Sequence, residues 1–176
     1  MKKLSMEELD RLTVTQFKES RKIPVTIVLD NIRSQHNIGS IFRTADAFRI
    51  ECIHLCGITA TPPNREIQKT ALGATESVEW SYFSSTLTSI NELKTKGYFI
   101  AAIEQADESI DISDVQFKMP EKTAIVFGNE VYGVSDEVMD VCDMCIEIPQ
   151  FGTKHSLNVS VSAGIVIWEI FKRFKG

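Results

Sequence analysis

The sequence lacks any apolar run of the roughly 18 residues that a membrane-spanning helix needs, although 43% of its 176 residues are hydrophobic. Its first residues, MKKLSMEELDRL, hold two lysines but no apolar centre, so they do not look like a secretory signal peptide. Internal repeats and low-complexity linkers are missing too. We therefore expect a globular cytoplasmic protein, with no membrane segment and enough apolar surface for a core.

Cysteine is scarce and occurs as two close pairs, Cys52 with Cys56 and Cys142 with Cys145. Four thiolates can bind zinc, but zinc knuckles carry their cysteine pairs in tight turns. Both pairs here lie in apolar, strand-like runs, where small buried hydrophobic side chains in a reducing compartment are the preferred interpretation. We therefore expect no metal site.

An excess of positive charge is also absent, because the formal net charge is −5. Taken alone, this argues against a nucleic-acid partner. The charge is uneven, however, because residues 76–153 hold 15 of the 24 acidic residues and only 4 of the 19 basic ones. If the two mildly basic ends fold onto one face, they could form a surface that attracts RNA. A solvated asymmetry without function explains the same pattern.

Short apolar runs and helical patterns alternate along the chain. Runs typical of buried parallel strands occupy residues 24–30, 51–57, 77–83, 98–104, 123–128 and 145–149, and helices are predicted at 38–48, within 61–72, at 85–97 with Gly97 after the last turn, and at 156–174. This alternation predicts an α/β fold with a largely parallel sheet flanked by helices.

The first 23 residues are predicted to form a helical extension ahead of a domain that spans residues 24–176. Ser5 and Glu8 have the spacing of a capping box, which would open an amphipathic helix over residues 6–20. We expect the apolar stripe of Leu9, Leu12 and Phe17 to pack on the protein. The basic residues of the extension would then face solvent or RNA; they are Arg11, Lys18, Arg21 and Lys22.

No loop carries the glycine pattern of a dinucleotide-binding fold or of a P-loop. Ligands of open parallel sheets bind beyond the carboxyl ends of the strands, and three of these ends carry polar loops. In the first loop, Asn37 is a natural helix N-cap and Gly39 permits close approach of the backbone. Arg43, among apolar neighbours, is either a buried ion pair, for instance with Asp46, or a phosphate clamp.

The second and third loops follow the runs at 123–128 and 145–149. Glu130, directly after an apolar strand, is either a capping or turn carboxylate or part of a loop that wraps a small ligand. In the third loop, Ser156 and Asn158 both suit the start of a helix. One cap does not explain both residues, nor the adjacent Lys154 and His155. Free backbone N–H groups there would favour an anionic ligand.

Three segments, NIGSIFRTADAF, IVFGNEVYGVS and IPQFGTKHSLNVSVSAGIVIWE, resemble the signature motifs of the SpoU (TrmH-like) class of the SPOUT methyltransferase superfamily. They occur in the family's order and spacing, and the resemblance covers about residues 24–173. It implies a C-terminal trefoil knot, S-adenosylmethionine bound in that knot, a homodimer, and methylation of ribose 2′-hydroxyls in tRNA or rRNA.

The resemblance also assigns residues. It implies catalytic roles for Asn37, Arg43, Glu130, Ser156 and Asn158, with Arg43 activating the hydroxyl or clamping the adjacent phosphate. The residues implied to hold the cofactor are Glu104, Gly128, Asn129, Ile148 and Leu157. Glu104 departs from the small or hydroxyl residue often found at its position.

The substrate is less clearly indicated. The stretch GYFIAAIEQADESIDI resembles the branch of the family that methylates the D-loop guanosine of tRNA more than the wobble-base branch. Methylation of rRNA ribose is an alternative. Two further alternatives are a SPOUT enzyme that methylates a base and an RNA-binding protein that has kept the fold without activity. The matched polar residues argue against both.

Overall fold

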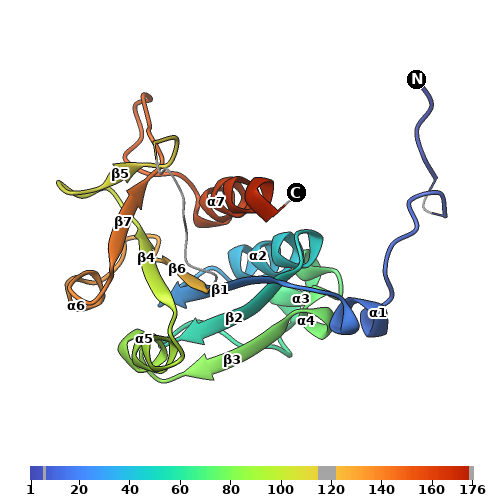
Figure 1. The fold of residues 1–176 in the computed structure, drawn as a ribbon, viewed down its shortest axis with the longest axis horizontal. Helices are drawn as coiled ribbons and strands as arrows, with labels where there is room; N and C mark the ends of the chain where they lie inside the picture. Colours follow the sequence, from blue (N-terminus) through green and yellow to red (C-terminus); the bar gives the residue numbers. More distant parts are fainter. Residues whose placement is uncertain (6, 115–121, 175–176) are drawn as a thin grey trace.

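The computed structural model describes residues 1–5, 7–114 and 122–174 (Figure 1). In this part of the chain the strands are β1 Ile23–Asp30, β2 Ile50–Cys56, β3 Glu79–Phe83, β4 Phe99–Ile103, β5 Ile110–Asp111, β6 Thr123–Phe127 and β7 Met144–Glu147. The helices are α1 Val14–Glu19, α2 Gln35–Ala47, α3 Arg65–Ala71, α4 Ala74–Ser77, α5 Thr86–Thr95, α6 Asp136–Met139 and α7 Val159–Phe174.

The strands form one sheet in the order β3-β2-β1-β6-β4-β7-β5, and every described pair is parallel. The predicted α/β class is therefore confirmed. Each predicted strand and each helix predicted after residue 37 is present, with ends shifted by a few residues. The two-residue β5 was not predicted. The trefoil knot stays a prediction.

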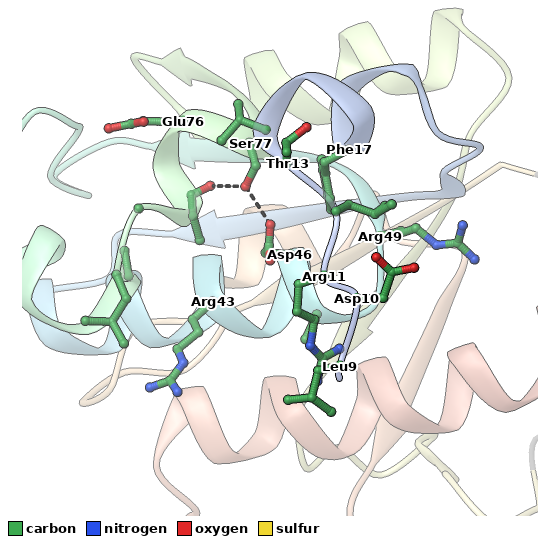
Figure 2. Close-up of a pocket in the computed structure, with 17 residues that line it drawn as sticks. Leu9, Asp10, Arg11, Thr13, Phe17, Arg43, Asp46, Arg49, Glu76 and Ser77 are labelled. Atoms are coloured by element: carbon green, nitrogen blue, oxygen red, sulfur yellow. Dashed lines mark hydrogen bonds between the residues drawn. The ribbon is translucent and has the colours of Figure 1, made fainter. Parts of the chain in front are cut away.

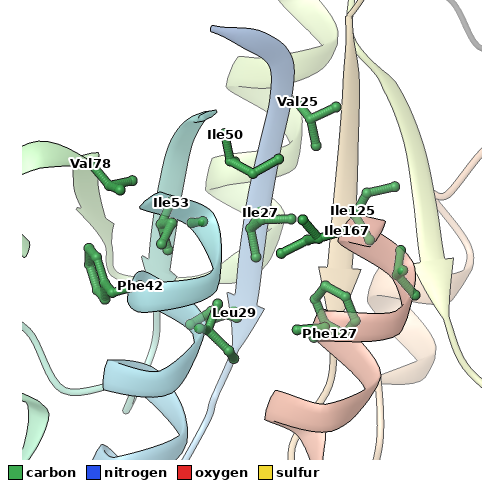
Figure 3. Close-up of a cluster of buried hydrophobic side chains, with 14 of the residues drawn as sticks. Val25, Ile27, Leu29, Phe42, Ile50, Ile53, Val78, Ile125, Phe127 and Ile167 are labelled. Carbon is green, nitrogen blue, oxygen red and sulfur yellow. The ribbon is translucent and has the colours of Figure 1, made fainter. Parts of the chain in front are cut away.

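Helices cover both faces of the sheet and enclose a core on each side. On one face, α2 and α7 pack over β1 and β6, and Figure 3 shows Ile27, Leu29 and Ile167 in this core. On the other face, α5 and α6 enclose the smaller core. The alternation of a strand explains the division, since Ile27 and Leu29 point to the first core and Val28 to the second.

The N-terminal extension differs from its prediction. Ser5 and Glu8 do form the reciprocal capping hydrogen bonds, but a single turn follows and Asp10 has a φ of 43°. Helix α1 begins only at Val14, behind a second capping box of Thr13 and Gln16. The predicted helix over residues 6–20 is therefore wrong for residues 7–13, and Met6 lies outside the described residues.

The expected apolar stripe of the extension is also largely wrong. Phe17 is buried, but Leu9 and Leu12 are 37% and 49% exposed. The first residues extend away from the body, on the side of the sheet that α2 and α7 cover (Figure 1). The α1 segment joins the domain by packing on α4.

A four-thiolate zinc site is incompatible with the sheet order. Cys52 and Cys56 lie on β2, and Cys145 lies on β7, with β1, β6 and β4 between them. Neighbouring strands are about 4.8 Å apart, so the two pairs cannot share one ion. Burial raises the pKa of Cys52, Cys56 and Cys142 to about 12. Among the described residues, no helix has the length and apolar character to cross a membrane.

Gly39 sets the distance between α2 and α3. A β-carbon at this position would lie 2.1 Å from Thr70 Oγ1 and 2.3 Å from the carbonyl oxygen of Ile67. The carbonyl belongs to a helix backbone and cannot move away cheaply. The predicted close approach at Gly39 is thus confirmed, and its partner is α3.

We expect Gly39→Ala to lower the free energy of unfolding by about 1–3 kcal/mol, because the added methyl overpacks the contact between α2 and α3. Urea unfolding measures this change. Gly152→Ala is the control, since a β-carbon at Gly152 meets nothing within 4 Å. Equal stability of Gly39→Ala and the wild type would contradict the packing argument.

Candidate functional site

Three of the predicted site residues form one hydrogen-bonded chain. Asn37 Nδ2 donates to Glu130 Oε1 at 3.1 Å, and Asn158 Nδ2 donates to Asn37 Oδ1 at 3.1 Å. We call Asn37, Glu130 and Asn158 the polar chain. Its members come from α2, from the loop after β6 and from the residue before α7, so residues 121 positions apart in sequence meet here.

Asn37 is free to join the polar chain because another residue caps its helix. The N-cap of α2 is Ser34, whose side chain accepts from the Asn37 backbone N–H. The prediction of Asn37 as N-cap is therefore wrong by three positions. Its side chain instead leaves the first turn of the helix toward the carboxyl ends of the strands.

At the other end of the polar chain, Asn158 caps the start of α7. The sequence had offered both Ser156 and Asn158 for this cap. The Oδ1 atom of Asn158 accepts from the backbone N–H of Ser160 at 2.9 Å and from Ser160 Oγ at 2.6 Å. Ser156 makes no such contact in the described part of the chain. It stays exposed on the loop before α7, where it can contact a ligand.

Glu130 links the loop after β6 to the start of α2. Besides Asn37, its carboxylate accepts from the backbone N–H of Arg33 at 2.9 Å and of Ser34 at 3.0 Å. Partial burial alone would raise the pKa of Glu130, but the hydrogen bonds from Arg33 and Ser34 outweigh this and lower it below the usual 4.5. Glu130 is thus an ionised brace between two loops, and its predicted part in a loop that wraps a ligand stays a prediction.

Glu104, whose role the sequence left unexplained, holds the same loop from the opposite side. Its Oε2 accepts from the Val134 N–H at 3.0 Å, and its Oε1 accepts from the Gln105 N–H at 2.9 Å. Asn129 closes the loop on itself through an antiparallel bridge with Gly133 and donates to the carbonyl oxygen of Asn31 at 2.7 Å. The acidic side chain at position 104 therefore fixes the loop conformation.

The loops after β4, β6 and β7 enclose a cavity of about 550 Å³. All the residues predicted to hold the cofactor line it: Glu104, Gly128, Asn129, Ile148 and Leu157. Glu130 and Ser156 line it too. Asn37 and Asn158 do not line it, and the polar chain connects them to Glu130.

The chemistry of this cavity favours a cation with an apolar part. Its walls include the carboxylates Glu104, Glu130 and Asp136, and no lysine or arginine among the described residues. Tyr132 and Leu157 present exposed apolar surface to it. A ligand dominated by phosphates would meet only negative charge here. Sequence reasoning missed Asp136 and Tyr132, although both lie within or next to the second motif.

Gly128 is needed for the backbone conformation of the loop after β6, and not to leave space inside the cavity. A β-carbon there would lie 2.1 Å from the Gly133 carbonyl carbon and 2.1 Å from the Val134 nitrogen. Replacing Gly128 with valine would therefore break the loop fold itself.

Arg43 lies apart from the other predicted site residues. It is exposed and lines a second cavity, of about 630 Å³, on the side of α1 and α4 (Figure 2). The buried ion pair with Asp46 is wrong: Asp46 accepts a hydrogen bond from Ser77 Oγ at 2.6 Å instead. Because Arg43 is exposed, only the other interpretation, a clamp for a phosphate, remains compatible with its position.

The lowered pKa of Glu130 predicts a local dependence of stability on pH. A carboxylate with a depressed folded pKa stabilises the protein fully above its unfolded value of 4.5 and loses this effect as pH falls through the folded value. We expect Glu130→Gln to remove that part of the acid destabilisation, so its stability falls less steeply below pH 4.5.

Urea unfolding across a pH series checks this expectation. Glu137→Gln is the matched control, because the Glu137 carboxylate is exposed on α6 and makes no hydrogen bond in the described part of the chain. Parallel pH curves for wild type and Glu130→Gln would show that the hydrogen bonds from Arg33 and Ser34 add no stability.

The sequence and the fold resemble those of known RNA methyltransferases. Residues 24–168 match the SpoU rRNA Methylase family. A Staphylococcus haemolyticus protein, provisionally named a TrmH family tRNA/rRNA methyltransferase, is 35% identical in an alignment of 162 residues that covers 90% of this chain and 64% of the relative. The chain thus spans just under two thirds of that curated relative.

Solved structures agree with this match. The TrmH/SpoU tRNA modifying enzyme of A. aeolicus superposes with a TM-score of 0.79 at 28% identity, covering 91% of this chain and 81% of that one. An AdoMet-bound rRNA methyltransferase from Sinorhizobium meliloti gives 0.81 at 25% identity, covering 91% and 61%. On the match over residues 24–168, and on the motifs that build the polar chain, this chain belongs to the SpoU (TrmH) family of RNA methyltransferases.

Proposed function

We propose that this protein transfers a methyl group from S-adenosylmethionine to a ribose 2′-hydroxyl of tRNA, with the D-loop guanosine as the target. The observation that carries the proposal is the polar chain, which joins all three signature motifs beside an acidic cavity. Ribose methylation of rRNA is the second candidate, favoured by the S. meliloti relative.

The acidic cavity suits this cofactor. S-adenosylmethionine carries a positive sulfonium and an ammonium group beside an adenine, and a cavity of 550 Å³ falls in the usual range for such ligands. The residues that would hold it are Glu104, Gly128, Asn129, Ile148 and Leu157. When bound, the cofactor supplies an electrophilic methyl group, and relatives of this fold were solved with AdoMet.

The protein's own contribution is positioning and charge. A methyl transfer is an in-line displacement, so orientation of the ribose supplies much of the rate. Ser156, exposed at the cavity, would orient the ribose, and the polar chain would hold Asn158 and the loop of Glu130 in place. Arginine is protonated at neutral pH, so Arg43 would act as a clamp for the phosphate beside the hydroxyl.

We also propose a cytoplasmic homodimer that uses α7. The helix buries Val159, Ala163 and Ile167 in the first core, but Val161 and Trp168 are 50% and 44% exposed on another side. Ile165 is half-buried, and a β-carbon at Gly164 would meet nothing within 4 Å. This apolar strip, Val161, Gly164, Ile165 and Trp168, follows the i, i+3, i+4, i+7 spacing of one helix face.

A dimer would also bring Arg43 to the rest of the site. In one chain Arg43 and Ser156 line different cavities. We infer that each site takes Arg43 from one subunit and Ser156 from the other. The division into an extension over residues 1–23 and a methyltransferase domain over residues 24–176 belongs to the same proposal.

Arg43→Ala tests the catalytic role. We expect methyl transfer to fall by at least a hundredfold, since the clamp on the phosphate is lost, on the order of 3 kcal/mol. Affinity for S-adenosylmethionine should stay within a few fold, because Arg43 does not line the acidic cavity. Nucleoside digestion and mass spectrometry of unmodified tRNA and rRNA transcripts, with isothermal titration of the cofactor, give both readouts.

Arg21→Ala is the control, since Arg21 is exposed and lines neither cavity. Near-normal turnover of Arg43→Ala would contradict the assignment. Methylation of a base, seen in the same digest, would refute the ribose reaction. No cofactor binding by the wild type would favour an RNA-binding protein without activity.

Ile165→Asp tests the dimer. A charge in the apolar strip should give monomers or insoluble protein, because an unpaired carboxylate cannot be buried between two helices without a large cost. Analytical ultracentrifugation at micromolar concentration measures the state. Ile58→Asp is the matched control, since Ile58 is 68% exposed and far from α7 in sequence. Ile167 is fully buried in the core and is not the residue to change.

Mixed subunits test whether the site is composite. Arg43→Ala and Ser156→Ala should each be inactive, but co-expressed chains should regain activity, since a mixed dimer keeps one intact site. Inactive mixed dimers would place both residues in the site of one chain. A monomeric wild type would refute the dimer itself.

A further inference from the structure

The second cavity lies where the N-terminal segment meets α2 and the turn between α3 and α4. Three arginines from different parts of the chain line it: Arg11, Arg43 and Arg49. None of them forms an ion pair with another described residue. Guanidinium groups that gather without forming ion pairs favour the binding of an anion.

Three carboxylates also line this cavity, but none of them forms an ion pair with its arginines in the described part of the chain. Figure 2 shows Arg11 and Arg43 extending past α2 on the same side, whereas Glu76 lies at the other end of the view. Asp46 is engaged by Ser77. Asp10 is the remaining carboxylate of the cavity, next to Arg11 in the chain.

Exposed apolar side chains line the same cavity, so it combines two kinds of contact. Leu9, Leu12, Val14 and Leu72 are between 37% and 66% exposed. Three separate segments of the chain thus supply apolar surface and guanidinium groups to the second cavity. A nucleotide unit of a nucleic acid has this pair of features, since its base is flat and apolar on its faces and its phosphate is anionic.

The backbone around the cavity is held in uncommon conformations. Four described non-glycine residues have positive φ, and three of them line this cavity: Asp10 at 43°, Arg49 at 52° and Leu72 at 50°. Arginine and leucine rarely adopt this region, which costs on the order of 1 kcal/mol each. Leu72 is the left-handed C-cap of α3 and Arg49 follows the C-cap of α2, so two of these conformations end helices at the cavity wall.

We propose that this cavity binds a nucleotide unit of the substrate RNA, with Arg11 and Arg43 contacting the same phosphodiester group. The N-terminal segment is then an RNA-binding wall of the site. Of the four basic residues that the extension offers to RNA by sequence, Arg11 alone lines the cavity among those described. The proposal rests on the proposed function for the identity of the RNA.

A double-mutant cycle tests the shared phosphate. The full-length protein binds unmodified tRNA transcripts and rRNA fragments, followed by fluorescence anisotropy from low to physiological salt. Arg11→Ala should weaken binding about tenfold, the effect of one lost charged hydrogen bond. It should also reduce the magnitude of the slope of log affinity against log salt by about 0.7–0.9, which is the contribution of one phosphate contact.

Arg11→Ala with Arg43→Ala together should weaken binding by clearly less than the product of the single effects, because both changes remove one shared contact. Arg11→Lys should recover part of the affinity, since lysine keeps the charge but not the bidentate geometry. Arg21→Ala is the matched control, an exposed arginine of the same extension outside the cavity, and should bind within twofold of the wild type.

The outcomes separate this inference from the proposed function. If Arg11→Ala matches Arg21→Ala in affinity and salt slope, the cavity is not an RNA site, even when the wild type methylates ribose. Fully additive effects of Arg11→Ala and Arg43→Ala would overturn the shared phosphate. If the wild type methylates no RNA but Arg11→Ala still weakens binding with the expected slope, the RNA site stands and the proposed reaction fails.

Discussion

The loop after β6 depends on carboxylates that accept hydrogen bonds from backbone amides. Glu104 binds the Val134 N–H, Asp30 binds the Ser135 N–H at 3.3 Å, and Glu130 binds the start of α2 from within the loop. Charge-assisted hydrogen bonds are about twice as strong as neutral ones. The loop between β6 and α6 is thus held from three sides. The polar chain and the acidic cavity both rely on it.

Helix α2 separates two cavities of different chemistry. Its first turn carries Asn37 toward the acidic cavity, and its third turn carries Arg43 to the arginine-lined one. Thirteen residues of helix span about 20 Å. The uneven charge of the sequence has a partial structural counterpart, since Glu104, Glu130 and Asp136 line one cavity and Arg11, Arg43 and Arg49 line the other. A cationic cofactor and an anionic RNA would each find a complementary site.

The sequence predicted the repeating parts of the fold because strand and helix periodicities are local. The runs at 24–30 and 123–128 became β1 and β6 almost unchanged, and the cofactor residues gathered at one cavity because parallel strands bring their carboxyl ends to one edge. Helix caps and side-chain exposures that depend on long-range contacts could not be predicted from the sequence. Ser34 capped α2 in place of Asn37, and the capping box at Ser5 was followed by Asp10 with positive φ instead of a helix. The exposure of Arg43 follows from how α2 turns against its neighbours.

The order of the sheet has a consequence for synthesis on the ribosome. Strand β6 lies between β1 and β4, and Val25 pairs with Thr123. The strands β1, β2 and β3 can associate early, but β1 keeps an unpaired inner edge until almost a hundred more residues have left the exit tunnel. Such distant pairing slows folding and exposes apolar edges to aggregation. The nascent chain would therefore need protection, by a chaperone or by rapid collapse of its first half, during about half of its own synthesis.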